Sequence, residues 1–169
     1  MILIFHGSTD LTHNQQAIRL AEAVGAKCAF MEVEPRFRGG LGVPIFITDG
    51  ADYRKALEIA TVKAPPLVRW PGFIEYLKSL DADLYIFHGP DYGGIKDLPI
   101  ALLYGEPNLR KAPCVKTAMP VVLTRGYIYR KIEAEYTSRC PASLLPPLAE
   151  QEPFVEYLKA TIKTIVDTY

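Results

Sequence analysis

Short apolar runs alternate with amphipathic stretches along the whole chain. Residues 2–5 are apolar and rich in strand-forming side chains, and residues 12–24 then place their apolar side chains on one helical face. We expect Thr12 to cap this helix and Gly25 to end it. Because such alternation recurs to the end of the chain, the pattern predicts an α/β fold with parallel strands joined by helices.

The remaining strands and helices are predicted from the same alternation of apolar runs and amphipathic stretches. In the first half it predicts strands at residues 28–33, 43–48 and 67–70, and helices at residues 53–61 and 73–80. In the second half it predicts strands at residues 84–87, 101–104, 121–124 and 143–145, helices at residues 128–136 and 153–167, and a degraded helix at residues 91–98. Ligands of parallel sheets bind beyond the carboxyl ends of the strands, so we expect the functional side chains to lie at those ends.

Four sequence blocks occur twice, in the same order and with spacers of varying length. Residues 4–7, 34–38, 44–50 and 73–78 recur at residues 86–89, 106–110, 120–126 and 154–159. One short match can arise by chance, but four matches in one order indicate an internal duplication. We therefore predict two similar small lobes, residues 1–81 and 82–169, each a parallel sheet flanked by helices.

Composition narrows the class of protein. The chain has 169 residues, 49% of them hydrophobic, and a formal net charge of zero, which argues against a nucleic-acid-coating protein. No apolar run approaches the roughly 20 residues of a membrane-spanning helix, and the first residues lack a basic leader, so the cytoplasm is the expected location. The widely spaced Cys28, Cys114 and Cys140 indicate neither a disulfide framework nor a zinc knuckle.

Histidines are the first candidates for chemistry. His6 and His88 occupy matching positions, each directly after an apolar strand and before a glycine. Imidazole accepts protons and binds borderline divalent metals, although a strand-end histidine can also serve only the turn. His13 lies one turn into the first helix, where we expect it at the surface, with a role along an access path as the alternative.

Acidic and basic residues could complete such a site. Glu32 and Glu34 face the same side of their strand and could supply a carboxylate ligand or a proton relay, with Glu32 favoured. The Arg54–Lys55 and Arg130–Lys131 pairs, which follow Tyr53 and Tyr129, could grip the carboxylates of a polyanionic ligand. Solvated strand ends and helix surfaces are the alternatives. The chain contains no GxSxG, Walker A, GxGxxG or HExxH motif.

In their order, these blocks resemble the class II tetrapyrrole chelatases, especially the short sirohydrochlorin cobaltochelatases and the siroheme ferrochelatases. The resemblance lies in an apolar strand running into His-Gly-Ser at residues 6–8, a Phe-apolar-Glu-apolar strand ending near Glu-Pro at residues 30–35, and a strand opening at Pro44. It implies an enzyme, a lyase, that inserts Co²⁺ or Fe²⁺ as substrate into a carboxylate-rich tetrapyrrole such as sirohydrochlorin, in cobalamin or siroheme synthesis. It implies no organic cofactor.

Carried over residue by residue, the resemblance makes His6 the metal-binding and proton-abstracting histidine and Glu32 its acidic partner. It leaves Ser8, Tyr53, Arg54 and Arg130 as substrate-binding candidates. The family's second histidine falls eight residues after the strand-opening proline, where this chain has Asp52 in the first half and Ile128 in the second. Either Asp52 serves as a ligand, or His88 supplies the second imidazole from across a cleft, or chelatase activity has been lost.

The sequence is therefore compatible with three hypotheses about the function of the protein. The first is the chelatase, acting as a monomer with pseudo-two-fold lobes or as a homo-oligomer, with no nucleic-acid or membrane partner. The second is a non-catalytic relative that binds metal or tetrapyrrole. The third is an unrelated α/β domain whose repeat only builds a core, in which case His6 and His88 would point away from any shared cleft.

Overall fold

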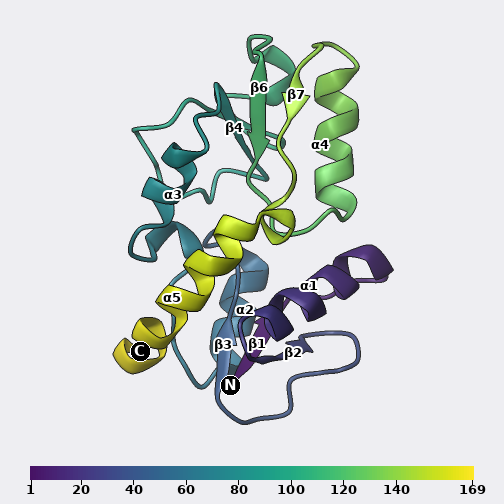
Figure 1. The fold of residues 1–169 in the computed structure, drawn as a ribbon. Helices are drawn as coiled ribbons and strands as arrows, with labels where there is room; N and C mark the ends of the chain where they lie inside the picture. Colours follow the sequence, from purple (N-terminus) through teal and green to yellow (C-terminus); the bar gives the residue numbers. More distant parts are fainter.

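The computed structural model describes residues 1–169 and contains two parallel sheets, one in each half of the chain (Figure 1). The first sheet has the order β2-β1-β3, with β1 (Ile2–Phe5), β2 (Lys27–Phe30) and β3 (Gly42–Pro44). The second has the order β5-β4-β6-β7, with β4 (Leu84–Phe87), β5 (Ile100–Leu102), β6 (Thr117–Pro120) and β7 (Ser143–Leu144). All strand pairs are parallel, so the predicted α/β fold with two parallel-sheet lobes is confirmed.

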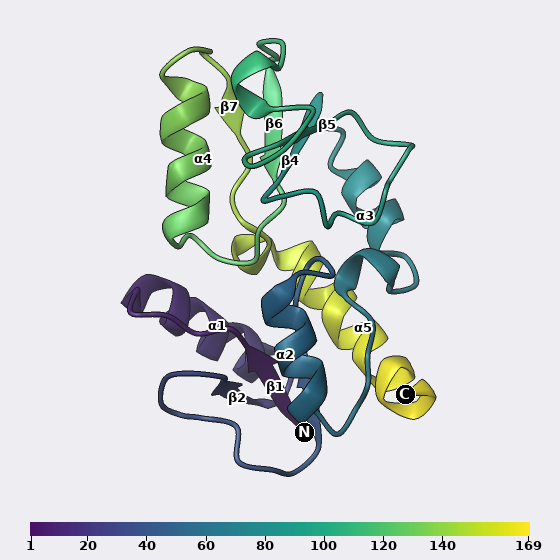
Figure 2. The same cartoon turned by 180° about the vertical axis from the view of Figure 1, so that it is seen from behind.

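Five α-helices surround the sheets: α1 (Leu11–Ala23), α2 (Ala51–Ile59), α3 (Phe73–Ser79), α4 (Tyr127–Thr137) and α5 (Glu152–Thr168). Three short 3₁₀ helices complete the secondary structure: η1 (Leu67–Arg69), η2 (Leu109–Lys111) and η3 (Leu148–Glu150). In both ribbon views α1 and α2 flank the first sheet, whereas α4 flanks the second (Figures 1 and 2). None of the helices combines the length and apolar character needed to cross a bilayer.

The helices α3 and α5 cross between the lobes. α3 precedes β4 in sequence but lies beside the second sheet, where Tyr85 Oη donates to the Leu77 carbonyl at 2.5 Å (Figure 2). α5 ends the chain but runs back along the first lobe (Figure 1). The predicted boundary between residues 81 and 82 falls in the segment between α3 and β4; it stays a prediction.

The repeated α3 and α5 blocks pack directly against each other. Phe73 meets its own counterpart Phe154 with ring centroids 6.3 Å apart, and Tyr76 stacks on its counterpart Tyr157 at 6.0 Å. The cross pairs are also present, Phe73 with Tyr157 at 6.2 Å and Tyr76 with Phe154 at 5.8 Å. Contacts of this reciprocal kind define a two-fold interface, so the lobes are related as the subunits of a symmetric dimer are.

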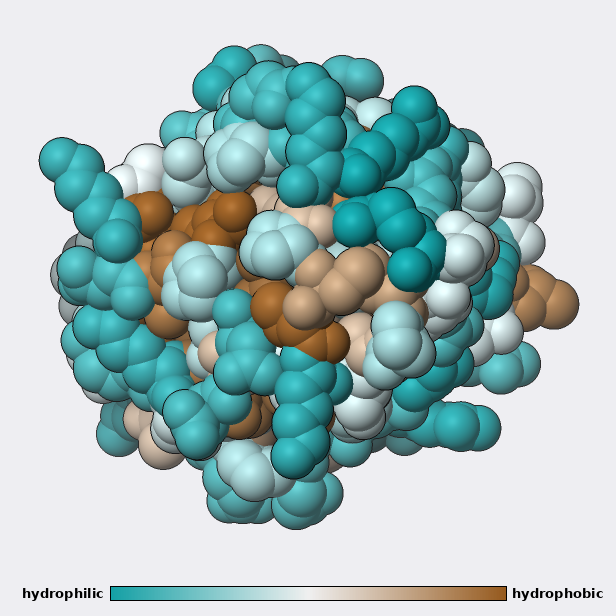
Figure 3. All heavy atoms as spheres, turned by 90° about the horizontal axis from the view of Figure 1, so that it is seen from above, coloured by the Kyte–Doolittle hydropathy of each residue, from teal (hydrophilic) through white to brown (hydrophobic).

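One hydrophobic core joins the two halves. Its 27 buried residues include Leu3 and Phe5 of β1, Tyr85 and Phe87 of β4, and the facing side of α5. Leu84 and Ile86, on the other face of β4, belong to a separate cluster of 10 buried residues packed with α4. β4 is thus buried on both faces, which explains its continuous apolar sequence. Figure 3 views the second lobe from its outer end, where hydrophilic side chains surround smaller apolar patches.

Equivalent hydrogen bonds recur in the two lobes. Tyr53 Oη donates to the Ala64 carbonyl at 2.8 Å, and its counterpart Tyr129 donates to the Leu145 carbonyl at 3.0 Å. The Leu67 and Leu148 amides, which open η1 and η3, donate to the carbonyls of the matched residues Phe46 and Val122. The duplication seen in the sequence is therefore reproduced in backbone geometry.

Two predicted apolar strands overrun the sheets. β3 ends at Pro44 rather than residue 48, and the strand predicted at residues 121–124 lies earlier, as β6. The apolar residues 45–47 and 121–123 continue beyond the strand ends and line a cleft between the lobes. They are apolar because of that cleft and not because they belong to a ladder.

Two further element predictions are wrong. The strand predicted at residues 67–70 is instead η1, which ends at Arg69, because the Trp70 amide donates to the Leu67 carbonyl and closes a turn. Residues 91–98 form no helix, because Gly93 and Gly94 adopt left-handed φ values of 83° and 66° that interrupt helical backbone. The second half consequently lacks a counterpart of α1.

The cysteine spacing indicates no disulfide framework, but the structure contains one disulfide. Cys114 and Cys140 are bonded, with Cα atoms 5.2 Å apart, because the end of α4 returns to the segment before β6. Cys28 is free and half-buried, and burial raises the pKa of its thiol to about 12. Sequence spacing gave no sign of the pair, since the two cysteines meet only after α4 has packed.

We expect reduction of the Cys114–Cys140 disulfide to lower the free energy of unfolding by about 3 kcal/mol, because it closes a loop across 26 residues of the unfolded chain. The measurement is thermal and urea unfolding with and without a phosphine reductant. Cys114→Ser, at an exposed position, should show the lower stability in both conditions. Equal stability of the oxidised protein and the fully reduced protein would contradict the prediction.

Candidate functional site

A cleft of about 420 Å³ lies between the lobes and draws its lining equally from the two halves of the chain. Its walls are the matched apolar segments 45–47 and 121–123, and Phe5 and Phe87 line it at the ends of β1 and β4. Ten of the 18 lining residues are hydrophobic, and polar side chains occupy most of the remaining positions. Cavities of this size and character are typical of small-molecule sites.

Both strand-end histidines line this cleft. His6 follows β1 and His88 follows β4, and the pseudo-two-fold relation brings the carboxyl ends of these two strands to the same space. This placement is the opposite of what a repeat that only builds a core would show. Desolvation lowers the pKa of His88, against the opposing influence of the Asp52 and Asp91 carboxylates.

Asp52 lies beside His6. The first turn of α2 carries Asp52 into the cleft, and its Oδ2 atom is 3.6 Å from His6 Nδ1. Its counterpart Ile128, in the first turn of α4, lines the same cleft with an apolar side chain. The two half-sites have therefore diverged, and only the first half pairs an imidazole with a carboxylate.

Glu32 does not join this group. β2 ends at Phe30, earlier than predicted, and the chain bends away so that Glu32 is exposed and does not line the cleft. Its carbonyl accepts a hydrogen bond from Arg36 Nη2 at 2.9 Å. The alternation argument that placed Glu32 at a strand end fails because no strand continues to that residue.

The substrate-binding candidates are dispersed. Ser8 lines the cleft, and its Oγ atom accepts a hydrogen bond from the Asp10 backbone amide at 2.9 Å. Tyr53 donates its hydroxyl hydrogen to a buried carbonyl and borders a second, adjoining pocket. The two arginines are exposed and already paired, Arg54 with an Asp49 carboxylate oxygen at 3.0 Å and Arg130 with one of Asp10 at 2.8 Å.

The sequence predicts His13 at the surface, with an access-path role only as the alternative. Instead of lying at the surface, His13 is half-buried and lines the cleft, with Nδ1 2.6 Å from Thr124 Oγ1 of the other lobe. Burial, followed by the charge of the neighbouring His6, lowers the pKa of His13. The sequence around His13 could not predict this position, because its hydrogen-bond partner Thr124 is 111 residues away.

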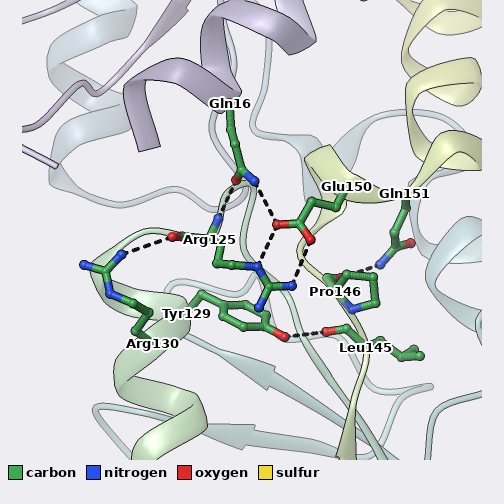
Figure 4. A network of polar contacts seen from close by, with 8 residues as sticks. All are labelled: Gln16, Arg125, Tyr129, Arg130, Leu145, Pro146, Glu150 and Gln151. Atoms are coloured by element: carbon green, nitrogen blue, oxygen red, sulfur yellow. Dashed lines mark hydrogen bonds and ion pairs between the residues drawn. The ribbon is translucent and has the colours of Figure 1, made fainter. Parts of the chain in front are cut away.

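One face of α1 ties the lobes together. Asp10, His13 and Gln16, spaced at three residues, contact Arg130, Thr124 and Arg125 of the second lobe. Figure 4 shows the part around Gln16, whose side-chain oxygen accepts the Arg125 amide at 2.6 Å and whose amide donates to Glu150 at 2.8 Å.

Arg125 and Glu150, both hydrogen-bonded to Gln16 of this face, form a bidentate ion pair. Two guanidinium nitrogens of Arg125 donate to the two oxygens of Glu150, both at 2.8 Å, and the guanidinium lies 4.6 Å from the centroid of the Tyr129 ring. The hydrogen bond from Arg125 is the main reason that the pKa of Glu150 lies below its ordinary value. A bidentate pair of this geometry fixes the loop before α4 against η3, and Gln16 of α1 bonds both partners.

Comparison with solved structures gives one informative similarity. A structure described as that of CbiX, the terminal enzyme for biosynthesis of siroheme in denitrifying bacteria, superposes with a TM-score of 0.66 over 96% of this chain and 97% of that chain, at 16% sequence identity. This chain has the CbiX fold. No family model matches the sequence, and no curated protein matches it.

The fold expected from the resemblance to class II chelatases is thus confirmed over nearly the whole chain. Within this CbiX fold the cleft is closed on one side by α1. On the other side, where the second half lacks its first helix, the segment 88–99 leaves an adjoining pocket of about 360 Å³ bordered by Asp52, His88 and Asp91. The cleft therefore widens toward the side of His88.

We expect Glu150→Gln to lower the free energy of unfolding at pH 7 by about 1 kcal/mol, the upper end of the range for a partly exposed pair. Because the folded-state pKa of Glu150 lies below its ordinary 4.5, the stabilisation is complete above about pH 4.5 and is lost as the pH falls through the lowered value. Urea unfolding at pH 7 and pH 3 measures the difference between wild type and variant, which should shrink at pH 3.

The exposed Glu156, which makes only a 3.9 Å contact to Lys159, provides the matched control. Glu156→Gln should leave the free energy of unfolding within about 0.5 kcal/mol of wild type at both pH values. Equal losses for the two variants would show that the Arg125–Glu150 pair contributes nothing specific.

Proposed function

We propose that this protein inserts a divalent metal ion, Co²⁺ or Fe²⁺, into a carboxylate-rich tetrapyrrole such as sirohydrochlorin, as cobalamin or siroheme synthesis requires. The observation that carries the proposal is that His6, Asp52 and His88 line one cleft between the two lobes of the CbiX fold. The metal ion and the macrocycle are both substrates, and the chemistry calls for no organic cofactor.

Metal insertion requires removal of two pyrrole N–H protons and delivery of a partly dehydrated ion to the ring centre. His6 is the group we assign to both tasks, because neutral imidazole binds such ions and accepts protons at neutral pH. The Asp52 carboxylate, 3.6 Å from His6 Nδ1, stabilises the imidazolium that forms. We assign the acidic role to Asp52 rather than Glu32, since Glu32 is exposed outside the cleft.

An ion that is handed on should have few protein ligands. No group of three or more His, Cys, Asp or Glu side chains is arranged to hold a metal ion in this protein. A structural zinc site usually has four protein ligands, whereas a site with open positions can pass its ion to pyrrole nitrogens. The sparse donor set at His6 suits transfer better than storage.

The macrocycle would lie between the apolar walls of the cleft. Segments 45–47 and 121–123 come from opposite lobes and can cover the two faces of a flat ring. His88 lies where the cleft widens, and there we expect the ring's acidic groups to reach solvent. Ser8 in the main cleft and Tyr53 beside the wider pocket remain candidates for ring contacts. Arg54 and Arg130 could bind ring carboxylates by exchanging their partners Asp49 and Asp10.

A second candidate is a non-catalytic protein that binds metal or tetrapyrrole for delivery. Asp52 and Ile128 favour it, because they stand where the class II chelatases place their second histidine. The two candidates differ in turnover, which a kinetic assay detects directly.

We expect the wild-type protein to accelerate Co²⁺ or Fe²⁺ insertion into sirohydrochlorin over the spontaneous rate. His6→Ala should reduce the accelerated rate by about 10²–10⁴-fold, the usual contribution of a positioned base. The assay follows the absorption change of the macrocycle under anaerobic conditions. Gln15→Ala, at an exposed position on α1, should leave the rate unchanged.

Two results would contradict the proposal. The first is a wild-type rate no greater than the spontaneous one, and the second is an unchanged rate in His6→Ala. Tight stoichiometric binding of metallated product without turnover would favour the delivery protein instead.

A further inference from the structure

Two buried side-chain polar atoms in the whole protein lack a hydrogen-bond partner: His13 Nε2, and His6 Nδ1, which lies 3.6 Å from Asp52 Oδ2, beyond hydrogen-bond distance. Both belong to imidazoles that line the interlobe cleft. Leaving a buried polar atom unsatisfied costs about 1–3 kcal/mol, so native proteins rarely do so without a reason. That both exceptions are imidazole nitrogens of the same cleft points to a shared ligand.

The His13 ring is held in place from the opposite lobe. Its Nδ1 atom bonds Thr124 Oγ1 at 2.6 Å, and when Nδ1 carries the hydrogen of that bond, Nε2 has a free lone pair. Gly126 allows the close approach, since a Cβ atom there would lie 3.2 Å from His13 Cβ and 3.4 Å from Thr124 Oγ1. Metal-binding histidines are commonly fixed in this way through their second ring nitrogen.

We propose that His6 and His13 together form the acceptor site for the divalent transition-metal ion, with His13 as a ligand through Nε2 and Thr124 as its positioning residue. The inference rests on the proposed function and names the second imidazole of its metal site. Two imidazoles suit Co²⁺, Fe²⁺ or Zn²⁺ and leave the remaining coordination positions to water or to pyrrole nitrogens. The ion would enter at the α1 side of the cleft.

His88 is the competing second imidazole. His88 is exposed, and its ring packs edge-on against Tyr104 with centroids 5.3 Å apart. It also borders the wider pocket with Asp91, away from the α1 wall. These contacts assign His88 to the macrocycle side of the cleft rather than to the ion.

The test is titration of the full-length protein with Co²⁺ alone under anaerobic conditions, followed by visible cobalt absorption and by calorimetry. The wild-type protein should bind one Co²⁺ ion. His13→Asn keeps an amide within reach of Thr124 but removes Nε2, and it should weaken Co²⁺ binding by at least about tenfold. His88→Asn should have a smaller effect, and Gln15→Ala, exposed on the same helix, should have none.

Thr124 supplies a second, independent readout. Thr124→Val should weaken Co²⁺ binding by about 10–100-fold, as loss of the partner of a ligating histidine does elsewhere. Thr124→Ser retains the hydroxyl and should bind Co²⁺ as the wild type does. If His13→Asn fails to fold, as judged by thermal unfolding, the comparison of valine with serine at position 124 still decides the question.

The inference is overturned if the wild type binds no Co²⁺, if His13→Asn folds and binds Co²⁺ with wild-type affinity, or if His88→Asn loses affinity and His13→Asn does not. These outcomes are separate from failure of the proposed function. His13-dependent Co²⁺ binding without insertion into sirohydrochlorin would retain the site and reject the enzyme. Insertion with a normal Co²⁺ affinity in His13→Asn would retain the enzyme and reject the site.

Discussion

The reciprocal packing of α3 against α5 sets the relation between the two lobes. Phe73 and Tyr76 meet the equivalent Phe154 and Tyr157 around a pseudo-two-fold axis, and the core that surrounds them includes residues of β1 and β4. The largest core cluster takes residues from both halves, so the burial of each sheet depends on the other half of the chain. The cleft exists because this core fixes where the two sheets end relative to each other.

Symmetry brings His6 and His88 to one space, but the chemistry there comes from departures from symmetry. The first half retains α1, whose polar face reaches Thr124, Arg125 and Arg130 and closes one side of the cleft. The second half has lost that helix, and the cleft widens at the segment 88–99 that replaces it. The result is a site with polar donors on the α1 wall, apolar segments from both lobes and a wider opening beside His88.

The pattern of apolar residues predicted the two parallel sheets but misplaced their ends. Residues 45–47 and 121–123 continue the apolar runs of β3 and β6, and nothing local distinguishes a strand from a cleft wall of the same composition. Glu32 was misplaced for the related reason that β2 stops at Phe30. Strand ends depend on which neighbouring strand remains available for pairing, and that depends on the sheet and not on the segment.

The sequence by itself determined the duplication, the α/β class and the position of a histidine at the end of the first strand of each half, because these follow from local periodicity and from repeated blocks. Only the tertiary structure decided that His13 meets Thr124, that Asp52 rather than Glu32 lies beside His6, and that Cys114 bonds Cys140. Each of these depends on segments far apart in the chain. Their proximity is set by the packing of helices on two sheets and of one lobe on the other. Local sequence patterns carry no information about such packing.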